Sequence, residues 1–189
     1  MATDGRALGN AHAVEDLERS TGLLREDWLR EHATTNAFVA DALEWVYAYG
    51  PWIAAGTVLV WLARRHPALY YRARDAMLLT AAAALFVFVL FPVAPPDGAE
   101  AFAALPSLQA GWAVVAGLGI AAAGRRARAR VAGAALALTL AAPVVLTGHH
   151  YVADALAGAA LTAGAWLFIR ARRPAVLRGY AGWDGLELH

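Results

Sequence analysis

The sequence predicts an all-α protein, a polytopic bundle of about five to six membrane helices preceded by an N-terminal amphipathic helical segment. The 189-residue chain is 60% hydrophobic, with a mean hydropathy of +0.46. Its apolar residues form five long runs, at about 51–63, 76–95, 108–123, 131–147 and 151–169. A helix of about 20 largely apolar residues crosses a bilayer. The run at 76–95 meets that length alone, and the others meet it with flanking small residues or some tilt.

The segment at residues 12–31 predicts one or two amphipathic helices, broken near Gly22 and lying on the membrane surface. Charged residues there alternate with apolar ones, namely Val14, Leu17, Leu23, Leu24, Trp28 and Leu29. This segment and its flanks form the first of three predicted regions, residues 1–34. The membrane bundle follows at 35–173, and a cytoplasmic tail at 174–189 completes the chain.

Residues 35–50 are predicted to form a separate helix that ends at Gly50-Pro51, because proline interrupts a helix. Whether this helix spans the membrane is left open. It carries Asp41 and Glu44 among aromatic residues. Ionisable residues inside a membrane suggest function, but that inference lapses if the helix lies at the interface. Aromatic residues near the expected helix ends predict an interfacial belt, formed by Tyr49, Trp52, Trp112 and Tyr151.

Arginine is distributed unevenly among the predicted connections. It fills alternate ones, at Arg64, Arg65, Arg72 and Arg74, then Arg125, Arg126, Arg128 and Arg130, then Arg170, Arg172 and Arg173. The stretches 95–108 and 148–150 contain no arginine or lysine. Basic connections face the cytoplasm. We therefore expect a multi-pass protein of a bacterial-type plasma membrane, with the loops around Pro95 and His150 together on the extracytoplasmic side.

Composition excludes several function classes. The chain has no cysteine, so it forms neither disulfides nor thiolate metal sites. Its formal net charge is +1, and no basic face interleaved with aromatic residues appears, so no nucleic acid is expected as a partner. The acidic N-terminus does not resemble a cleavable signal peptide. The expected partners are the lipid bilayer and an amphiphilic lipid substrate.

The segment Thr147-Gly-His-His-Tyr-Val-Ala-Asp154 carries the strongest sign of chemistry. His150 and Asp154 are four residues apart, so on a helix they would share one face. A carboxylate that accepts a hydrogen bond from one imidazole nitrogen fixes the tautomer and makes the other nitrogen more basic. The pair is thus a candidate nucleophile or base with its orienting group. The simpler alternative is a histidine at a helix start, followed by a first-turn aspartate that the helix dipole favours.

Three segments together resemble the type 2 phosphatidic acid phosphatase superfamily, most closely its branch of bacterial relatives of inositolphosphotransferases. They are Tyr71-Arg-Ala-Arg-Asp75 leading to Phe91-Pro-Val-Ala-Pro-Pro96, then Leu105-Pro-Ser-Leu-Gln-Ala-Gly-Trp112, then the segment at 147–154. The upstream Leu17-Glu-Arg-Ser-Thr-Gly22 also matches. The resemblance covers about residues 14–170 and implies a six-helix membrane bundle.

The resemblance implies residue roles. His150 resembles the histidine that attacks the lipid phosphorus and forms a phosphohistidine, and Asp154 resembles its orienting partner. The predicted substrate contacts are Gln109, Ser107, His149 and Asp97. The family requires no cofactor.

The sequence departs from the family pattern at two positions. Gln109 stands where relatives have the histidine of Pro-Ser-Leu-His, and glutamine is not a general acid near neutral pH. Losing such an acid typically costs 10²–10⁴-fold in rate, unless the leaving group is already good. Asp97 follows Pro95-Pro96 where relatives usually have an arginine. Phosphoryl transfer depends on neutralising charge at the phosphate oxygens, so a carboxylate there is unfavourable.

Two interpretations of the acidic loop remain open. Asp97 and Glu100 are either solvated loop charges or, with a histidine, oxygen ligands for a hard cation such as Mg²⁺. No defined metal-binding spacing supports the second. Arg19, Arg25 or Arg30 of the amphipathic segment could supply the missing cation. Gln109 either holds the substrate or His150 in place, or caps the helix that follows it.

Three functional hypotheses follow. The first is an integral-membrane enzyme that acts on a lipid or prenyl phosphate or diphosphate through His150 and Asp154. A diphosphate would reduce the need for the lost acid. The second is a catalytically degenerate member that binds lipid or serves as a scaffold, which the lost acid and cation favour. The third uses the same pair as acid and base in another lipid reaction, such as prenyl cyclisation.

Overall fold

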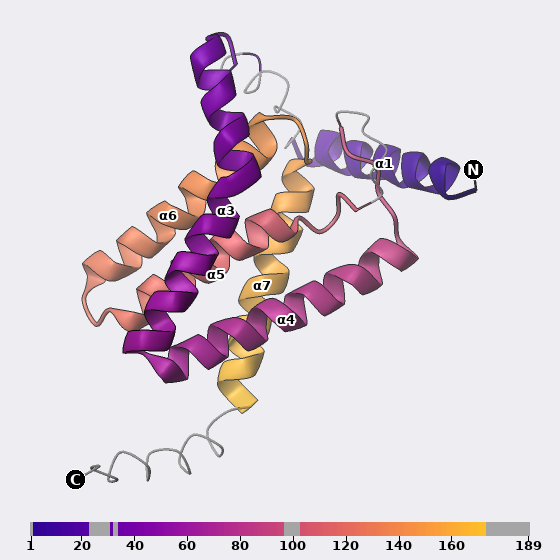
Figure 1. Ribbon diagram of the computed structural model, residues 1–189. Helices are drawn as coiled ribbons and strands as arrows, with labels where there is room; N and C mark the ends of the chain where they lie inside the picture. Colours follow the sequence, from indigo (N-terminus) through magenta and orange to yellow (C-terminus); the bar gives the residue numbers. More distant parts are fainter. Residues whose placement is uncertain (1, 23–30, 32–33, 97–102, 173–189) are drawn as a thin grey trace, which may run out of the picture.

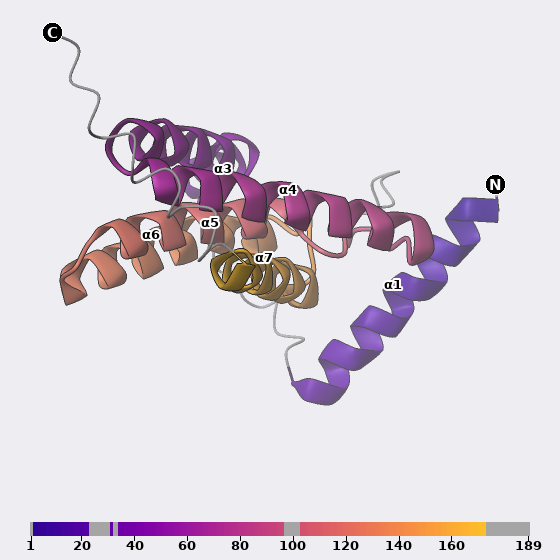
Figure 2. The same cartoon turned by 90° about the horizontal axis from the view of Figure 1, so that it is seen from below.

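The computed structural model describes residues 2–22, 31, 34–96 and 103–172. These residues form six helices, α1 (Ala2–Thr21), α3 (Ala37–Arg65), α4 (Pro67–Leu90), α5 (Leu108–Ala123), α6 (Ala127–Leu146) and α7 (Val152–Arg172). Helices α3 to α7 pack together, while α1 lies outside them, across the end where α4 stops and α7 begins (Figures 1 and 2). The prediction of an all-α polytopic bundle is confirmed.

Four described helices, α3, α4, α6 and α7, are long and apolar enough to cross a membrane. The fifth bundle helix, α5, has 16 residues and is about 24 Å long. It packs against all four others and forms the centre of the bundle. Five helices thus make up the described bundle, against the six implied by the family resemblance.

Small residues let α5 and α6 cross closely. A Cβ atom added at Gly117 of α5 would overlap the carbonyl oxygen of Gly133 on α6, and the reverse holds for Gly133. Membrane helices associate through such small-residue contacts, because lipid provides no hydrophobic drive for helix pairing. Val58, Leu62, Val115 and Trp166 pack in the adjoining core cluster.

The prediction that a helix ends at Gly50-Pro51 is wrong. One helix, α3, runs through Pro51 from an N-cap at Asn36, whose side chain accepts from the backbone N–H of Phe38 at 2.9 Å. Proline is tolerated inside membrane helices because neighbouring helices and side chains satisfy the backbone groups that it leaves without a partner. Pro51 is fully buried against the bundle. Residues 37–50 therefore belong to a longer candidate membrane span rather than to a separate helix.

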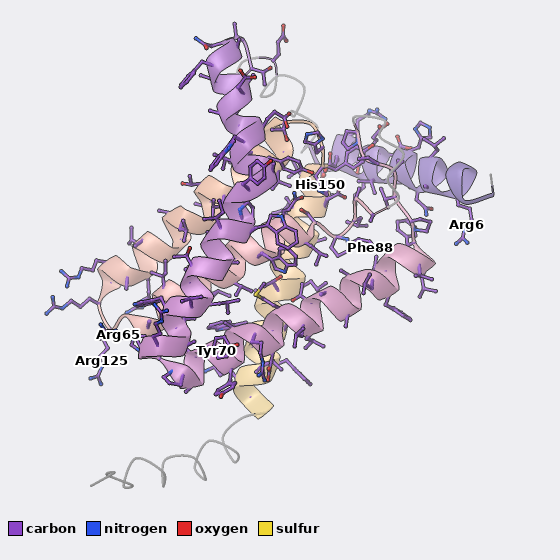
Figure 3. The ribbon with its side chains drawn as sticks, in the orientation of Figure 1. Arg6, Arg65, Tyr70, Phe88, Arg125 and His150 are labelled. Atoms are coloured by element: carbon purple, nitrogen blue, oxygen red, sulfur yellow. The ribbon has the colours of Figure 1, made fainter. Side chains whose placement is uncertain are left out.

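The arginine-rich connections are much shorter than predicted. Helices α3 and α4 are separated by His66 alone, so Arg72 and Arg74 belong to α4. Arg128 and Arg130 likewise belong to α6. Proline at the start of α4 explains the sharp boundary, since its fixed backbone angle suits a first helical position. Arg65 and Arg125, which flank the two connections, nevertheless lie at the end of the bundle far from His150, whereas Arg6 of α1 lies at the other end (Figure 3).

Helix α1 confirms part of the predicted amphipathic segment. It ends at Thr21, and Gly22 has a positive φ of 73°, a conformation that glycine tolerates best. Its buried face consists of Ala7, Ala11, Val14 and Glu18, spaced by three or four residues. Leu17, predicted on the apolar face, is 57% exposed, whereas Glu18 is fully buried. The predicted residues 23–30 lie outside the described part of the chain.

Candidate functional site

The candidate site lies in the turn between α6 and α7. Thr147 caps α6, and its hydroxyl donates to the carbonyl oxygen of Pro143 at 2.7 Å. Gly148 then adopts a positive φ of 82°, which reverses the chain direction and which a side chain would disfavour. His150 lies in the bend that follows, before α7 begins at Val152. The premise that His150 and Asp154 share a helical face is therefore wrong.

The turn still brings His150 and Asp154 together. Nδ1 of His150 lies 3.4 Å from Oδ2 of Asp154. It lies closer, at 3.0 Å, to the carbonyl oxygen of Ala104, which belongs to the segment before α5. His150 is 8% exposed and Asp154 is fully buried. Two oxygen acceptors thus face the same ring nitrogen.

This geometry assigns the proton of a neutral His150. A carbonyl oxygen and a carboxylate oxygen can only accept, so Nδ1 must carry the hydrogen. The lone pair then lies on Nε2, which points toward α5. Nε2 is 3.2 Å from the side-chain oxygen of Gln109. Because amide oxygen and nitrogen are assigned from the hydrogen-bond network, a neutral imidazole at this place requires the Gln109 amide to present its NH₂ group.

Gln109 therefore contacts His150 and does not cap α5. The cap is Ser107, whose hydroxyl accepts from the N–H of Ala110 at 3.3 Å. Ser107 is fully buried, and its own N–H donates to the carbonyl oxygen of Asp154 at 3.0 Å. This bond ties the start of α5 to the first turn of α7. Substrate contact by Ser107 stays a prediction.

Asp154 anchors the turn as well as the imidazole. Its Oδ2 accepts from the backbone N–H of Tyr151 at 3.0 Å, which is the back-reaching half of a helix capping box. The dipole of α7 stabilises the negative charge at this place. Its Oδ1 is buried and has no hydrogen-bond partner among the described atoms. The carboxylate thus lies beside the imidazole and binds the backbone that carries it.

Two carboxylates of α1 reach the same turn. Glu18 accepts from the N–H of Ala153 at 2.6 Å, and Glu15 accepts from the hydroxyl of Tyr151 at 3.2 Å. Tyr151 is 4% exposed, so its side chain packs inside the protein, and its predicted place in an interfacial aromatic belt stays a prediction. No motif in the sequence predicts a role for either glutamate. The sequence does contain one sign that Glu18 is buried, because its spacing from Ala11 and Val14 puts the three residues on one face of a helix.

His149 faces a different element from its neighbour. Its ring stacks on Tyr47 of α3, with centroids 4.4 Å apart, and its Nε2 lies 3.1 Å from Oε2 of Glu44. The ring centroid of Tyr47 is also 6.4 Å from that of His150. A turn below, Trp112 of α5 packs edge-on against Trp52 at 4.0 Å. The histidine pair is therefore bordered by α3 on one side and by α5 and α7 on the other.

Of the three arginines predicted to supply positive charge, only Arg19 lies among the described residues, and it pairs within α1. Arg19 pairs with Asp16 at 2.7 Å on the exposed side of α1, and Arg25 and Arg30 lie outside the described residues. Within 2–22, 34–96 and 103–172, no arginine is hydrogen-bonded to His150 or Gln109. The charged groups described beside the turn are mostly carboxylates.

The acidic loop cannot be placed. Asp97 and Glu100 lie outside the described residues, so their predicted roles in substrate or metal binding are untested. Among the side chains that the structure does describe, no three His, Asp or Glu residues come together as a potential metal site. Mg²⁺ stays a prediction that rests on the undescribed loop.

Comparison with known families decides the relationship. The family model of the PAP2 superfamily matches residues 12–101 and 97–168. The chain belongs to this superfamily. The match spans the end of α1, the whole described bundle up to α7, and the turn that carries His150. Searches of curated proteins and of solved structures gave no match. A membrane protein of a phosphatase-like family is thus established, and its reaction is a matter for proposal.

Proposed function

We propose that the protein transfers a phosphoryl group from a lipid or prenyl diphosphate, with His150 as the nucleophile and Asp154 as its orienting partner. The observation that carries this proposal is the placement of the imidazole. Nδ1 is held by Ala104 and Asp154, so the lone pair on Nε2 points away from both. Covalent catalysis typically uses a nucleophile that a neighbouring side chain orients. Asp154 is in place to orient His150 in this way.

The reaction would proceed in two steps. Nε2 of His150 forms a bond to the terminal phosphorus of the diphosphate, and the bond from that phosphorus to the bridging oxygen breaks. The lipid monophosphate leaves with the bonding electrons. Water then attacks the phosphohistidine, the N–P bond breaks, and inorganic phosphate is released. The sum is the hydrolysis of a lipid diphosphate to a lipid monophosphate and phosphate.

Gln109 is the reason to prefer a diphosphate over a monophosphate. It contacts Nε2 and stands where the family pattern has the histidine that protonates the leaving oxygen, and glutamine cannot release a proton near neutral pH. A lipid alkoxide is a poor leaving group and needs that proton. A phosphate leaving group does not. We propose that the site faces the extracytoplasmic side, because Arg65 and Arg125 of the arginine-rich connections lie at the opposite end of the bundle from His150.

The first prediction is a preference between substrates. Purified protein in detergent is offered prenyl diphosphates and the matching monophosphates, with and without Mg²⁺, and phosphate release is measured. We expect the diphosphate to be turned over faster by about 10²-fold or more, the range that a missing general acid costs. Equal turnover of both, or a faster monophosphate, would contradict the role given to Gln109.

The second prediction concerns Gln109→His. An imidazole there can donate a proton to the leaving oxygen, so turnover of the monophosphate should rise by about 10²-fold while that of the diphosphate changes little. Gln109→Asn, which keeps an amide, is the matched control and should not raise monophosphate turnover. The double variant with Asp97→Arg also restores the arginine that relatives usually have at that position of the sequence. A folded double variant that is inert on both substrates would count against an inherited phosphate site.

A second candidate function is a non-catalytic lipid-binding or scaffold protein. The specific observation in its favour is the contact between Gln109 and Nε2, which occupies the lone pair that a nucleophile needs. No turnover of any substrate by a folded wild-type protein would select this alternative.

A further inference from the structure

The N-cap residue of helix α7 supplies no side-chain acceptor to the N–H groups of the first turn. The carbonyl oxygen of Tyr151 accepts the first helical hydrogen bond, from the N–H of Ala155 at 3.3 Å, so Tyr151 occupies the N-cap position. The usual N-cap residues supply a side-chain oxygen to the N–H groups of the first turn. The hydroxyl of Tyr151 is instead directed to Glu15 on α1. The N–H of Ala153 must therefore find its acceptor elsewhere.

Glu18 supplies that acceptor from α1, 135 residues earlier in the chain. Its Oε1 accepts from the N–H of Ala153 at 2.6 Å, and its side chain is fully buried. Its Oε2 has no partner among the described atoms. A buried carboxylate with a single hydrogen bond is costly unless its surroundings hold it in place. The cost makes a purely incidental contact a poor explanation.

The rest of α1 is anchored so that Glu18 is held against α7. The side chain of Asn10 donates to the carbonyl oxygen of Pro92 at 2.8 Å, and the N–H of Ala94 donates to the carbonyl oxygen of Ala7 at 3.2 Å. The buried face of α1 packs against Val93, Ala94, Ala104 and Tyr151. Ala104 is the residue whose carbonyl binds His150. The cluster that buries α1 thus includes the residue whose carbonyl oxygen contacts Nδ1 of His150.

We propose that Glu18 is a positioning residue for His150, acting from α1 through the first turn of α7. Glu18 fixes Ala153, the neighbour of Asp154, and Asp154 in turn fixes the imidazole and the N–H of Tyr151. Glu15 holds the side chain of Tyr151 from the same helix. The effect on turnover rests on the proposed phosphoryl transfer. The effect on the imidazole does not.

The test compares Glu18→Gln with Glu18→Met in the full-length protein. Both replacements match the length of glutamate, but only glutamine keeps an oxygen that can accept from Ala153. Glu18→Met should lower kcat by about 10²-fold, the loss typical of a small misplacement of a reacting group, with KM nearly unchanged. Glu18→Gln should keep most of the wild-type kcat. Asp16→Ala is the matched control, because Asp16 is an exposed carboxylate of α1 that pairs with Arg19.

A second readout is independent of turnover. Nitrogen-15 spectra of histidine-labelled protein report which ring nitrogen carries the proton, and the His150 signal is identified by its loss in His150→Gln. We expect a protonated Nδ1 in the wild type, in Glu18→Gln and in Asp16→Ala, and an altered or averaged signal in Glu18→Met. Ala153→Pro removes the same hydrogen bond from its donor side, in the first turn of the helix, where the N–H has no intrahelical partner to lose, and should act like Glu18→Met.

The outcomes separate this proposal from the proposed function. If the wild type turns over no substrate but Glu18→Met alters the His150 signal, the reaction is wrong and the positioning role stands. If Glu18→Met or Ala153→Pro is folded and keeps wild-type kcat and an unchanged signal, the positioning role is overturned. It is also overturned if Glu18→Gln loses as much kcat as Glu18→Met. Should Glu18→Met fail to fold, Ala153→Pro and Glu18→Gln decide by the same criteria.

Discussion

Replacing His150 with alanine is expected to reduce phosphate release from a lipid diphosphate to the rate without protein, a loss on the order of 10⁴-fold or more. The reason is the geometry of Nε2. It is the only ring nitrogen of His150 left with a lone pair once Ala104 and Asp154 hold Nδ1. An alanine removes the atom that would bond to phosphorus. Initial rates at saturating substrate, with wild type measured in parallel, give the loss in kcat.

A control variant separates this loss from damage to the fold. His66 lies between α3 and α4, at the end of the bundle opposite His150, and packs edge-on against Trp61. His66→Ala should keep the wild-type rate. If His150→Ala retains more than about a tenth of the wild-type kcat, His150 is not the nucleophile. Size-exclusion elution and thermal stability of both variants establish that each is folded.

Gly158→Ala should both unfold the protein at lower temperature and abolish activity. A Cβ at Gly158 of α7 would overlap the backbone of Ser107, whose carbonyl oxygen, carbonyl carbon and nitrogen are all near it. Backbone atoms cannot rotate away, so we expect a loss of about 3 kcal/mol or more in the free energy of unfolding. The backbone N–H of Ser107 donates a hydrogen bond to the carbonyl oxygen of Asp154. The displacement would therefore reach the carboxylate that orients His150.

Gly164→Ala is the matched control for this substitution. Gly164 lies on the same helix and a Cβ there meets nothing within 4 Å. Alanine has a higher helix propensity than glycine, so the control should be unchanged or more stable by up to about 1 kcal/mol. Thermal unfolding in one detergent compares the two variants. Equal stability of Gly158→Ala and Gly164→Ala would show that α7 does not pass as closely to Ser107 as described.

Much of the fold was predictable because it depends on local composition. The apolar run at 108–123 has the same bounds as α5, and Gly22 marks the end of α1 as its backbone freedom suggests. The failures came where tertiary contacts override local preference. Pro51 was expected to end a helix, but it is buried in the middle of α3. Arg72 was assigned to a loop, but it belongs to α4 and its guanidinium lies over the ring of Trp166.

The site was predictable only as far as side-chain chemistry reveals it. His150, Asp154 and Gln109 come together as the motifs suggested, although His150 precedes the helix that was expected to carry it. The carbonyl of Ala104, the nearest oxygen to Nδ1, leaves no trace in the sequence, because any residue would provide it. Glu18 was overlooked because it stands among exposed charges and meets its partner across 135 residues.

The most direct measurement of the central claim is the capture of the phosphorylated protein. Wild-type protein is mixed with a prenyl diphosphate labelled in its terminal phosphate, quenched in alkaline detergent within the first turnover, and mapped by mass spectrometry. The predicted result is label on His150 that acid removes and alkali does not, and that His150→Ala lacks. Consumption of substrate without label on His150, or label on a different residue, would contradict the account.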